Sequence, residues 1–218
     1  MGRLQLSASE RAEKQREILR AAKEVFFQKG VHRATMDDVA ARAEVAKGTL
    51  YLYFQSKEEI LAHLLLEGLS ILLNRLEAAY APEDKLSPKE RIRRLAKAYL
   101  DFSRLYPDYF RLLMAFDRGR FQERVPARLF QEIFDRSMKG LELVARAVQE
   151  GVEDGSFKVD DPWRTAGMLW AALNGVLVLM AHPLRRQMLS TDLDSMFEAT
   201  LDLFLQGIKS QSSITKSH

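Results

Sequence analysis

The segment TMDDVAARAEVAKGTLYLYF, residues 35–54, decides the fold of the N-terminal part of the chain. Thr35 with Asp38 three residues later forms a capping-box pattern, which predicts that a short helix begins here. The turn Glu44-Val45-Ala46 follows this helix and precedes a second short helix over about residues 47–54. Two short helices joined by a tight turn predict a helix-turn-helix, a motif that places its second helix in the major groove of DNA.

The second short helix has one apolar side and one polar side. Leu50 and Phe54 are four residues apart and are therefore expected to face the core. Gly48 has no side chain, so the backbone can approach a phosphate closely. Lys57 opens the next helix, where its ammonium group and the free N–H groups of that helix can hold a phosphate. The side chains that remain for the DNA are Lys47, Thr49, Tyr51 and Tyr53.

Several residues of this segment also have an ordinary structural interpretation. Tyr51 and Tyr53 are alternatively aromatic residues of the core. Lys57 is alternatively a solvated surface lysine. Thr35 caps its helix in either case, so that a DNA contact would be an added role. Leu52 occupies an outward position and has two interpretations, contact with a thymine methyl group or sideways packing against the protein.

Cap residues and prolines predict an all-α fold of about nine helices. Leu and Ala number 32 and 24, against 11 Val, 7 Ile and 6 Thr, and this excess favours helices over strands. Ser9 is expected to cap the first helix, Gly30 to end it in a left-handed conformation, and Thr191 to cap the last. Pro183 is expected to stop the eighth. The expected ranges are about 9–30, 35–43, 47–54, 56–80, 87–105, 107–117, 126–154, 161–181 and 192–209.

The excess positive charge is confined to the first quarter of the chain. The net charge is +3, and residues 1–56 carry 10 Lys and Arg against 7 Asp and Glu, whereas residues 57–218 carry 23 of each. A basic small domain joined to a neutral large one is expected when only one end meets a polyanion. The sequence therefore predicts a DNA-binding domain over residues 1–56 and a larger helical domain over residues 57–218.

Composition excludes several classes of protein. A chain of 218 residues with 47% apolar and 29% charged residues is neither disordered nor collagen-like. Without cysteine there is no disulfide framework, and a cytoplasmic location is expected. The most apolar stretch, residues 166–181, is shorter than the roughly 20 residues of a bilayer span, so no membrane contact is expected. No metal-ligand, nucleophile or phosphate-loop motif occurs, and we expect neither an enzyme nor a cofactor.

The matches extend across residues 18–60. Beside Ile18, Phe26 and Gly30, the segments ATMDDVA at 34–40 and AEVAKGTLYLYFQSKEEI at 43–60 resemble the N-terminal domain of the TetR family of bacterial transcriptional regulators. The resemblance implies a homodimer that binds a palindromic operator and releases it when a small molecule enters the larger domain. It also implies that Thr35 and Lys57 contact phosphates, and that Lys47, Thr49, Tyr51 and Tyr53 contact bases or phosphates.

One residue departs from the pattern of this family. The family usually has glycine in the turn where this chain has Glu44. If the position requires a positive φ angle, the glutamate introduces strain on the order of 1 kcal/mol. We expect the helix-turn-helix to form nevertheless, with a small change in the angle of its second helix.

The larger domain contains aromatic residues at helical spacing, which are either plain core or the lining of a cavity for an apolar or aromatic effector. Asn174 is a polar anchor for a ligand or a hydrogen-bonding residue at a dimer seam. Four arginines near Gly119 either hold an anionic group or form a solvated basic loop; they are Arg118, Arg120, Arg124 and Arg128. The candidate effector-binding residues are Tyr99, Phe102, Tyr106, Phe110, Met114, Phe130, Phe134, Met138, Trp170 and Asn174.

Two helices have apolar faces that are wider than a surface helix needs. Residues 162–181 and 192–209 are therefore expected to pair two subunits, whereas a monomer with a closed core is the alternative. These features together predict a ligand-responsive repressor with a double-stranded operator and a small-molecule effector as partners. Two other functions remain open, an architectural or activator protein that binds DNA without an effector, and a helical carrier or enzyme for hydrophobic molecules with a vestigial DNA-binding domain.

Overall fold

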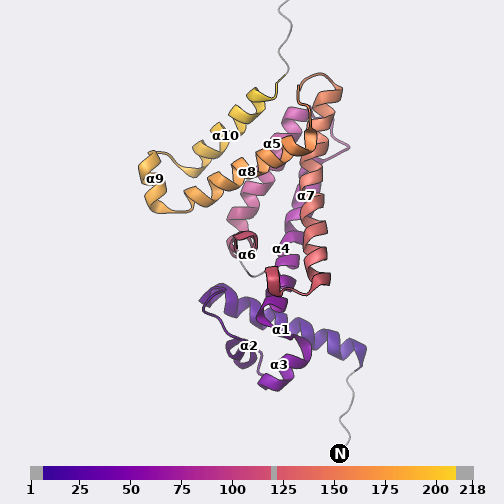
Figure 1. The fold of residues 1–218 in the computed structure, drawn as a ribbon, viewed down its shortest axis with the longest axis vertical. Coiled ribbons are helices and arrows are strands. Elements are labelled where there is room, and N and C mark those ends of the chain that lie inside the picture. Colours follow the sequence, from indigo (N-terminus) through magenta and orange to yellow (C-terminus); the bar gives the residue numbers. More distant parts are fainter. Residues whose placement is uncertain (1–6, 119–121, 210–218) are drawn as a thin grey trace, which may run out of the picture. The chain divides into compact units, whose positions relative to one another are not determined.

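The computed structural model of the chain describes residues 7–118 and 122–209, and it confirms the all-α fold. These residues form ten α-helices and the short 3-10 helix Gln122–Arg124 (Figure 1). The helices are α1 (Ala8–Lys29), α2 (Met36–Arg42), α3 (Lys47–Tyr53), α4 (Lys57–Tyr80), α5 (Pro88–Leu105), α6 (Pro107–Arg118), α7 (Ala127–Glu153), α8 (Pro162–Met180), α9 (Pro183–Leu189) and α10 (Leu193–Gly207).

Side-chain caps start most of these helices, as the sequence predicts. The Thr35 hydroxyl accepts a hydrogen bond from the Asp38 backbone N–H, and the Asp38 carboxylate accepts one from the Thr35 N–H. Ser87 and Glu90 form the same reciprocal pair at the start of α5. At α4 only half of such a box forms, because the Glu59 N–H donates to the Ser56 hydroxyl while the Glu59 carboxylate accepts from the Gln55 N–H.

Two predicted caps are wrong. The first helix is capped by Ser7, which shares a capping box with Glu10, and Ser9 lies inside α1. Ser9 is three residues from Ala12, which has no side-chain acceptor for the second half of such a box. The last helix is capped by Asp192 and not by Thr191, because the Asp192 carboxylate accepts the Ser195 N–H at 2.8 Å.

The structure corrects two expectations about helix ends. Gly30 has the expected positive φ, 81°, but its ψ is 150°, so that α1 ends outside the left-handed helical conformation. Pro183 follows the end of α8 as expected, but it also begins α9, an additional short helix. Proline is well tolerated in the first turn of a helix, where its missing N–H would have no partner. Ser190, with a φ of 50°, ends α9.

The chain divides into two compact units. One comprises Met1–Ser70 and Tyr106–Asp135, and the other comprises Ile71–Leu105 and Arg136–His218. In the first unit α1, α2 and α3 pack on one another around an apolar core. This core contains fully or almost fully buried side chains from all three helices and the start of α4, namely Ile18, Ala22, Phe26, Val39, Leu50, Phe54 and Ile60.

The turn between α2 and α3 has a strained residue. Glu44 adopts a φ of 53°, the left-handed region that disfavours side chains with a Cβ atom. The Val45 N–H donates to the Ala40 carbonyl at 3.0 Å and closes the turn. The turn therefore keeps the backbone conformation that suits glycine, and the glutamate adopts it.

In the second unit α8 and α10 lie side by side, and α5 packs against both (Figure 1). Within the described part of the chain, no single helix has both the length and the apolar composition to cross a membrane. Only α8 and α9 taken together pass that test, and they bend by 105°.

Arg91 is the buried charge that holds the end of α4 in the second unit. Its side chain is only 7% exposed, and its Nε lies 3.0 Å from a carboxylate oxygen of Glu150 on α7. Its terminal nitrogens donate to the backbone carbonyl of Tyr80, the last residue of α4, and to those of Ala81 and Asp84 in the loop that follows. A cation at this end of a helix is favourable, because the last carbonyls have no partners within the helix.

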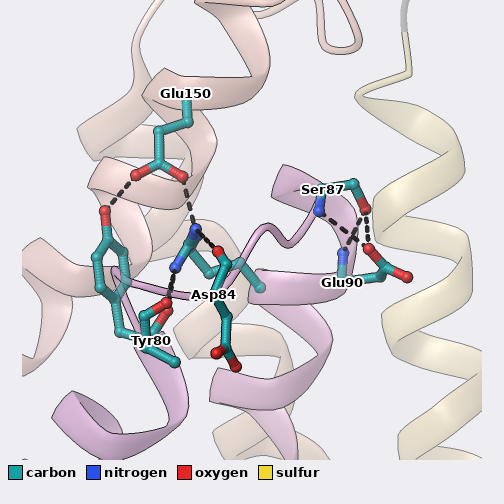
Figure 2. A network of polar contacts seen from close by, with 7 residues as sticks. Tyr80, Asp84, Ser87, Glu90 and Glu150 are labelled. Atoms are coloured by element: carbon teal, nitrogen blue, oxygen red, sulfur yellow. Dashed lines mark hydrogen bonds and ion pairs between the residues drawn. The ribbon is translucent and has the colours of Figure 1, made fainter.

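Tyr80 completes this network (Figure 2). Its hydroxyl donates to the other carboxylate oxygen of Glu150, and the guanidinium carbon of Arg91 lies 4.6 Å from the centre of its ring. Burial, and then the hydrogen bond with Glu150, raise the pKa of the Tyr80 phenol. One guanidinium thus fixes the C-terminus of α4, the following loop and α7.

We expect Arg91→Ala to lower the free energy of unfolding by about 3 kcal/mol, because it leaves the Glu150 carboxylate and several helix-end carbonyls without their partner. The matched control is Arg94→Ala. Arg94 pairs with Asp84 at 2.7 Å, but both side chains are about half exposed, so its loss should cost at most about 1 kcal/mol. Urea denaturation of both variants measures the difference, and equal losses would contradict the assigned role of Arg91.

Glu44→Gly should raise the free energy of unfolding by about 0.5–1 kcal/mol. The relieved left-handed strain of about 1–2 kcal/mol exceeds the additional chain entropy of an unfolded glycine. Glu44→Ala removes the same carboxylate but keeps the Cβ atom, and its stability should stay within about 0.5 kcal/mol of the original. The same denaturation measurement distinguishes the two, and an equal gain in both variants would assign the effect to charge.

Candidate nucleic-acid interface

The core of the first unit fixes which side of α3 faces outward. Leu50 and Phe54 are completely buried and lie one helical turn apart. Lys47, Gly48 and Tyr51 are exposed, and Thr49 and Tyr53 are half-buried. Tyr51 retains 42% of its accessible surface, so that neither tyrosine is a core residue. The helix therefore presents the predicted DNA-binding side chains away from the core.

Lys47 is paired with an acid across the turn. Its Nζ lies 2.6 Å from a carboxylate oxygen of Asp37 in the first turn of α2, and both side chains are exposed. The hydrogen bond with Asp37 raises the pKa of Lys47. Asp37 could not be identified as a partner from the sequence, because the pairing depends on the angle between α2 and α3. A phosphate that binds Lys47 must therefore compete with this carboxylate.

The Thr35 hydroxyl belongs to the cap of α2. It accepts the Asp38 N–H at 3.2 Å and donates to the Asp38 carboxylate at 2.9 Å. Lys29 also donates to this carboxylate, and these hydrogen bonds, that of Lys29 first, lower the pKa of Asp38 to about 2. Thr35 itself is exposed, so that the capped start of α2 is accessible to solvent.

Lys57 has a structural role that the sequence analysis did not predict. Its Nζ donates to the backbone carbonyls of Ala34 at 2.6 Å and His32 at 3.4 Å, and lies 5.8 Å from the ring centre of Phe26. Partial burial lowers the pKa of this ammonium group. Lys57 therefore holds the loop that leads into α2, and it is not an ordinary solvated lysine.

Arg11 supports the other end of α3. Its guanidinium donates to the backbone carbonyl of Leu52 at 3.3 Å, and its central carbon lies 5.7 Å from the ring centre of Tyr53. No local pattern indicates this contact, because the two residues are 41 positions apart in the chain. Arg11 and Lys57 together tie α3 and the loop before α2 to the adjoining helices.

A polar cluster in the same unit connects α6 with α1 and α4. The Lys23 ammonium group donates to a carboxylate oxygen of Glu67 at 2.9 Å and to the Tyr109 hydroxyl at 3.2 Å. The Tyr109 ring meets Phe27 edge to face at 5.1 Å. A Cβ atom at Gly68 would lie 2.7 Å from this ring, so that glycine permits the close approach of α6 to α4. Burial, and then the Glu67 carboxylate, raise the pKa of Tyr109.

The candidate effector residues are divided equally between the two units. Tyr106, Phe110, Met114, Phe130 and Phe134 belong to the first unit, and Tyr99, Phe102, Met138, Trp170 and Asn174 to the second. Within the second unit the Tyr99 hydroxyl donates to the Asn174 side-chain carbonyl, which gives the polar residue of α8 a partner on α5. Within the first, the rings of Phe116 and Phe130 lie 6.2 Å apart. The more exposed members are Phe130, Phe134, Met138 and Trp170.

The arginines near Gly119 are only partly described. Arg120 and the side chain of Arg118 lie outside the described residues. Arg124 lies 3.7 Å from Glu58, and Arg128 lies 3.4 Å from Glu132 one turn along α7; both arginine side chains are more than three-quarters exposed. These two residues thus have the contacts of a solvated charged surface.

Family models match most of the described chain. Residues 18–64 match the model for bacterial regulatory proteins of the tetR family, and residues 92–204 match the tetracyclin repressor-like C-terminal domain. The uncharacterized HTH-type transcriptional regulator YhgD of Bacillus subtilis is 29% identical over 152 residues, which are 68% of this chain and 74% of the relative.

Two solved structures share the fold. The regulator FadR from Bacillus subtilis in complex with stearoyl-CoA has a TM-score of 0.65 at 23% identity, over 88% of this chain and 98% of that one. A transcriptional regulator from Saccharomonospora viridis in complex with choline has a TM-score of 0.73 at 20% identity, over 92% and 100%.

The relatives are regulators of transcription, which as a class are not enzymes. The C-terminal model alone covers more than half of the chain, and the N-terminal model covers the helix-turn-helix described above. The chain belongs to the TetR family of bacterial transcriptional regulators.

Proposed function

We propose that this protein is a repressor that binds a palindromic operator as a homodimer and is released by a small-molecule effector. The observation that carries the proposal is the outward face of α3, where Lys47 and Tyr51 are exposed while Leu50 and Phe54 are buried. A helix with this arrangement can enter the major groove without exposing its core. As a bacterial repressor, the protein would act in the cytoplasm, where the chromosome lies.

The contacts with DNA follow from this orientation. Lys47, Thr49, Tyr51 and Tyr53 are the side chains of α3 that can reach base edges or phosphates. A Cβ atom at Gly48 would meet nothing within 4 Å, so that packing within the protein gives no reason for a glycine there. Close approach of the α3 backbone to the DNA supplies such a reason. Thr35 and Lys57 would contact phosphates at the starts of α2 and α4.

Homodimerisation would cover the apolar faces of α8 and α10. Met168, Trp170, Leu179 and Leu203 are all at least 46% exposed on these two helices. Exposed apolar side chains in such number support a face that is buried by another subunit. Pairing through residues 162–181 and 192–209 would present two copies of α3 to half-sites about 34–36 Å apart.

The effector would bind in the larger domain, residues 57–218, and change the position of α4. The aromatic candidates, among them Tyr99 and Phe102, favour an apolar or aromatic compound. The cluster of Lys23, Glu67 and Tyr109 supports a connection between effector binding and the DNA-binding helices. A shift of α6, which carries Tyr109, would disturb contacts with both α1 and α4. A coupling of about 1–3 kcal/mol would change operator affinity roughly 5- to 150-fold.

Selection of bound duplexes from a random DNA pool, with the purified protein at physiological salt, tests this function. We expect a single palindrome to be enriched, with half-sites about one helical turn apart. If the folded protein enriches no sequence, it does not read an operator. Effectors are then tested on the selected operator, and compounds that bind the protein but leave its operator affinity unchanged would contradict effector-controlled release.

Lys57→Gln should weaken binding to the operator and to unrelated duplexes by the same factor. Loss of one phosphate contact should reduce the slope of log K against log salt by about 0.9 per subunit. Glutamine can still donate toward the Ala34 carbonyl, which limits damage to the loop before α2. Lys89→Gln removes the same charge from the exposed start of α5 and should leave the slope unchanged. An unchanged slope for Lys57→Gln would remove this residue from the interface.

A further inference from the structure

Leu52 is an apolar side chain at the centre of the outward face of α3. Successive residues of a helix are rotated by 100°, so that Leu52 lies opposite the direction shared by Leu50 and Phe54. It retains 60% of its accessible surface, whereas Leu50 and Phe54 retain none. This exposure favours an outward contact over sideways packing, the two interpretations that the sequence left open.

The position of Leu52 is fixed by its backbone and its neighbours. Arg11 donates to its carbonyl at 3.3 Å, and α3 cannot rotate without exposing Leu50 and Phe54. Gly48, one turn earlier on the same outward side, carries no side chain, and the space around it is open. Leu52 is therefore the most exposed apolar side chain of α3.

The major groove offers one apolar group on a base edge, the 5-methyl group of thymine. The other groups by which the bases are distinguished there are hydrogen-bond donors and acceptors, which a leucine side chain cannot satisfy, and cytosine has only a hydrogen where thymine has the methyl group. We propose that Leu52 is a specificity-determining residue that contacts a thymine methyl group in each half-site of the operator. This inference rests on the proposed function, because it requires α3 to enter the major groove.

Replacement of thymine by deoxyuridine tests the contact directly, since it removes the methyl group and keeps the hydrogen-bonding atoms. Each thymine of the selected operator is replaced symmetrically in both half-sites, and affinities are measured at constant salt. At one position, the affinity of the original protein for the operator should fall about fourfold per substituted half-site, or about 15-fold when both half-sites are substituted. The fourfold change corresponds to about 0.8 kcal/mol for one methyl group that is no longer buried.

Variants assign this loss to Leu52. Leu52→Ala should bind the thymine and deoxyuridine operators with equal affinity. Leu52→Met keeps a long apolar side chain and should still bind the deoxyuridine operator more weakly than the thymine operator. Leu105→Ala makes the same truncation at a leucine of α5 that is 61% exposed, and should also retain it.

Two outcomes would overturn the contact. Either the original protein shows no position that is sensitive to the methyl group, or Leu52→Ala keeps the original ratio between its affinities for the thymine and deoxyuridine operators. In each case the enriched palindrome itself leaves the proposed function standing. If no palindrome is enriched at all, the proposed function and this inference fail together.

Discussion

The burial of Leu50 and Phe54 is the constraint on which the candidate interface depends. Both side chains are completely buried, Leu50 within a helix of only seven residues and Phe54 at the residue that ends it. Full burial stabilises each by about 1.5–3 kcal/mol, which is large for so short a helix. Apolar packing therefore sets the rotation of α3. The outward direction of Tyr51 and Leu52 is a consequence of that packing and needs no polar contact of their own.

Long-range hydrogen bonds from cations to backbone carbonyls hold the segments next to this helix. Lys57 donates to the carbonyls of Ala34 and His32, and Arg11 donates to the carbonyl of Leu52. Arg91 does the same at the far end of α4, with three carbonyls and the Glu150 carboxylate. In each case a positive charge satisfies acceptors that helix or loop geometry leaves unpaired. A lysine that the family pattern assigns to DNA thus also belongs to the scaffold.

The helix start was predicted correctly at α2, where Thr35 and Asp38 satisfy each other, but not at α1, where Ser7 and Glu10 form the same reciprocal pair. The prediction also failed where adjacent residues compete for one role. Thr191 and Asp192 are both good caps, and only the direction of the chain before α10 selects Asp192. A proline is ambiguous in the same way, because it is common both after the end of a helix and in the first turn of one. Pro183 follows α8 and begins α9. The positive φ of Glu44 agrees with the expectation from the family pattern, because a turn this tight permits few backbone conformations.

By itself the sequence determined the all-α fold, the helix-turn-helix and the face of α3 that meets the core. Each of these depends on residues within one or two helical turns, which interact whatever the rest of the chain does. Only the tertiary structure decided that Asp37 pairs with Lys47, that Lys57 binds the loop before α2, and that Tyr109 packs on Gly68. These contacts join different helices, and no local spacing encodes the angle at which two helices meet. The exposure of Leu52 has the same origin, since neighbouring helices could have covered it and do not.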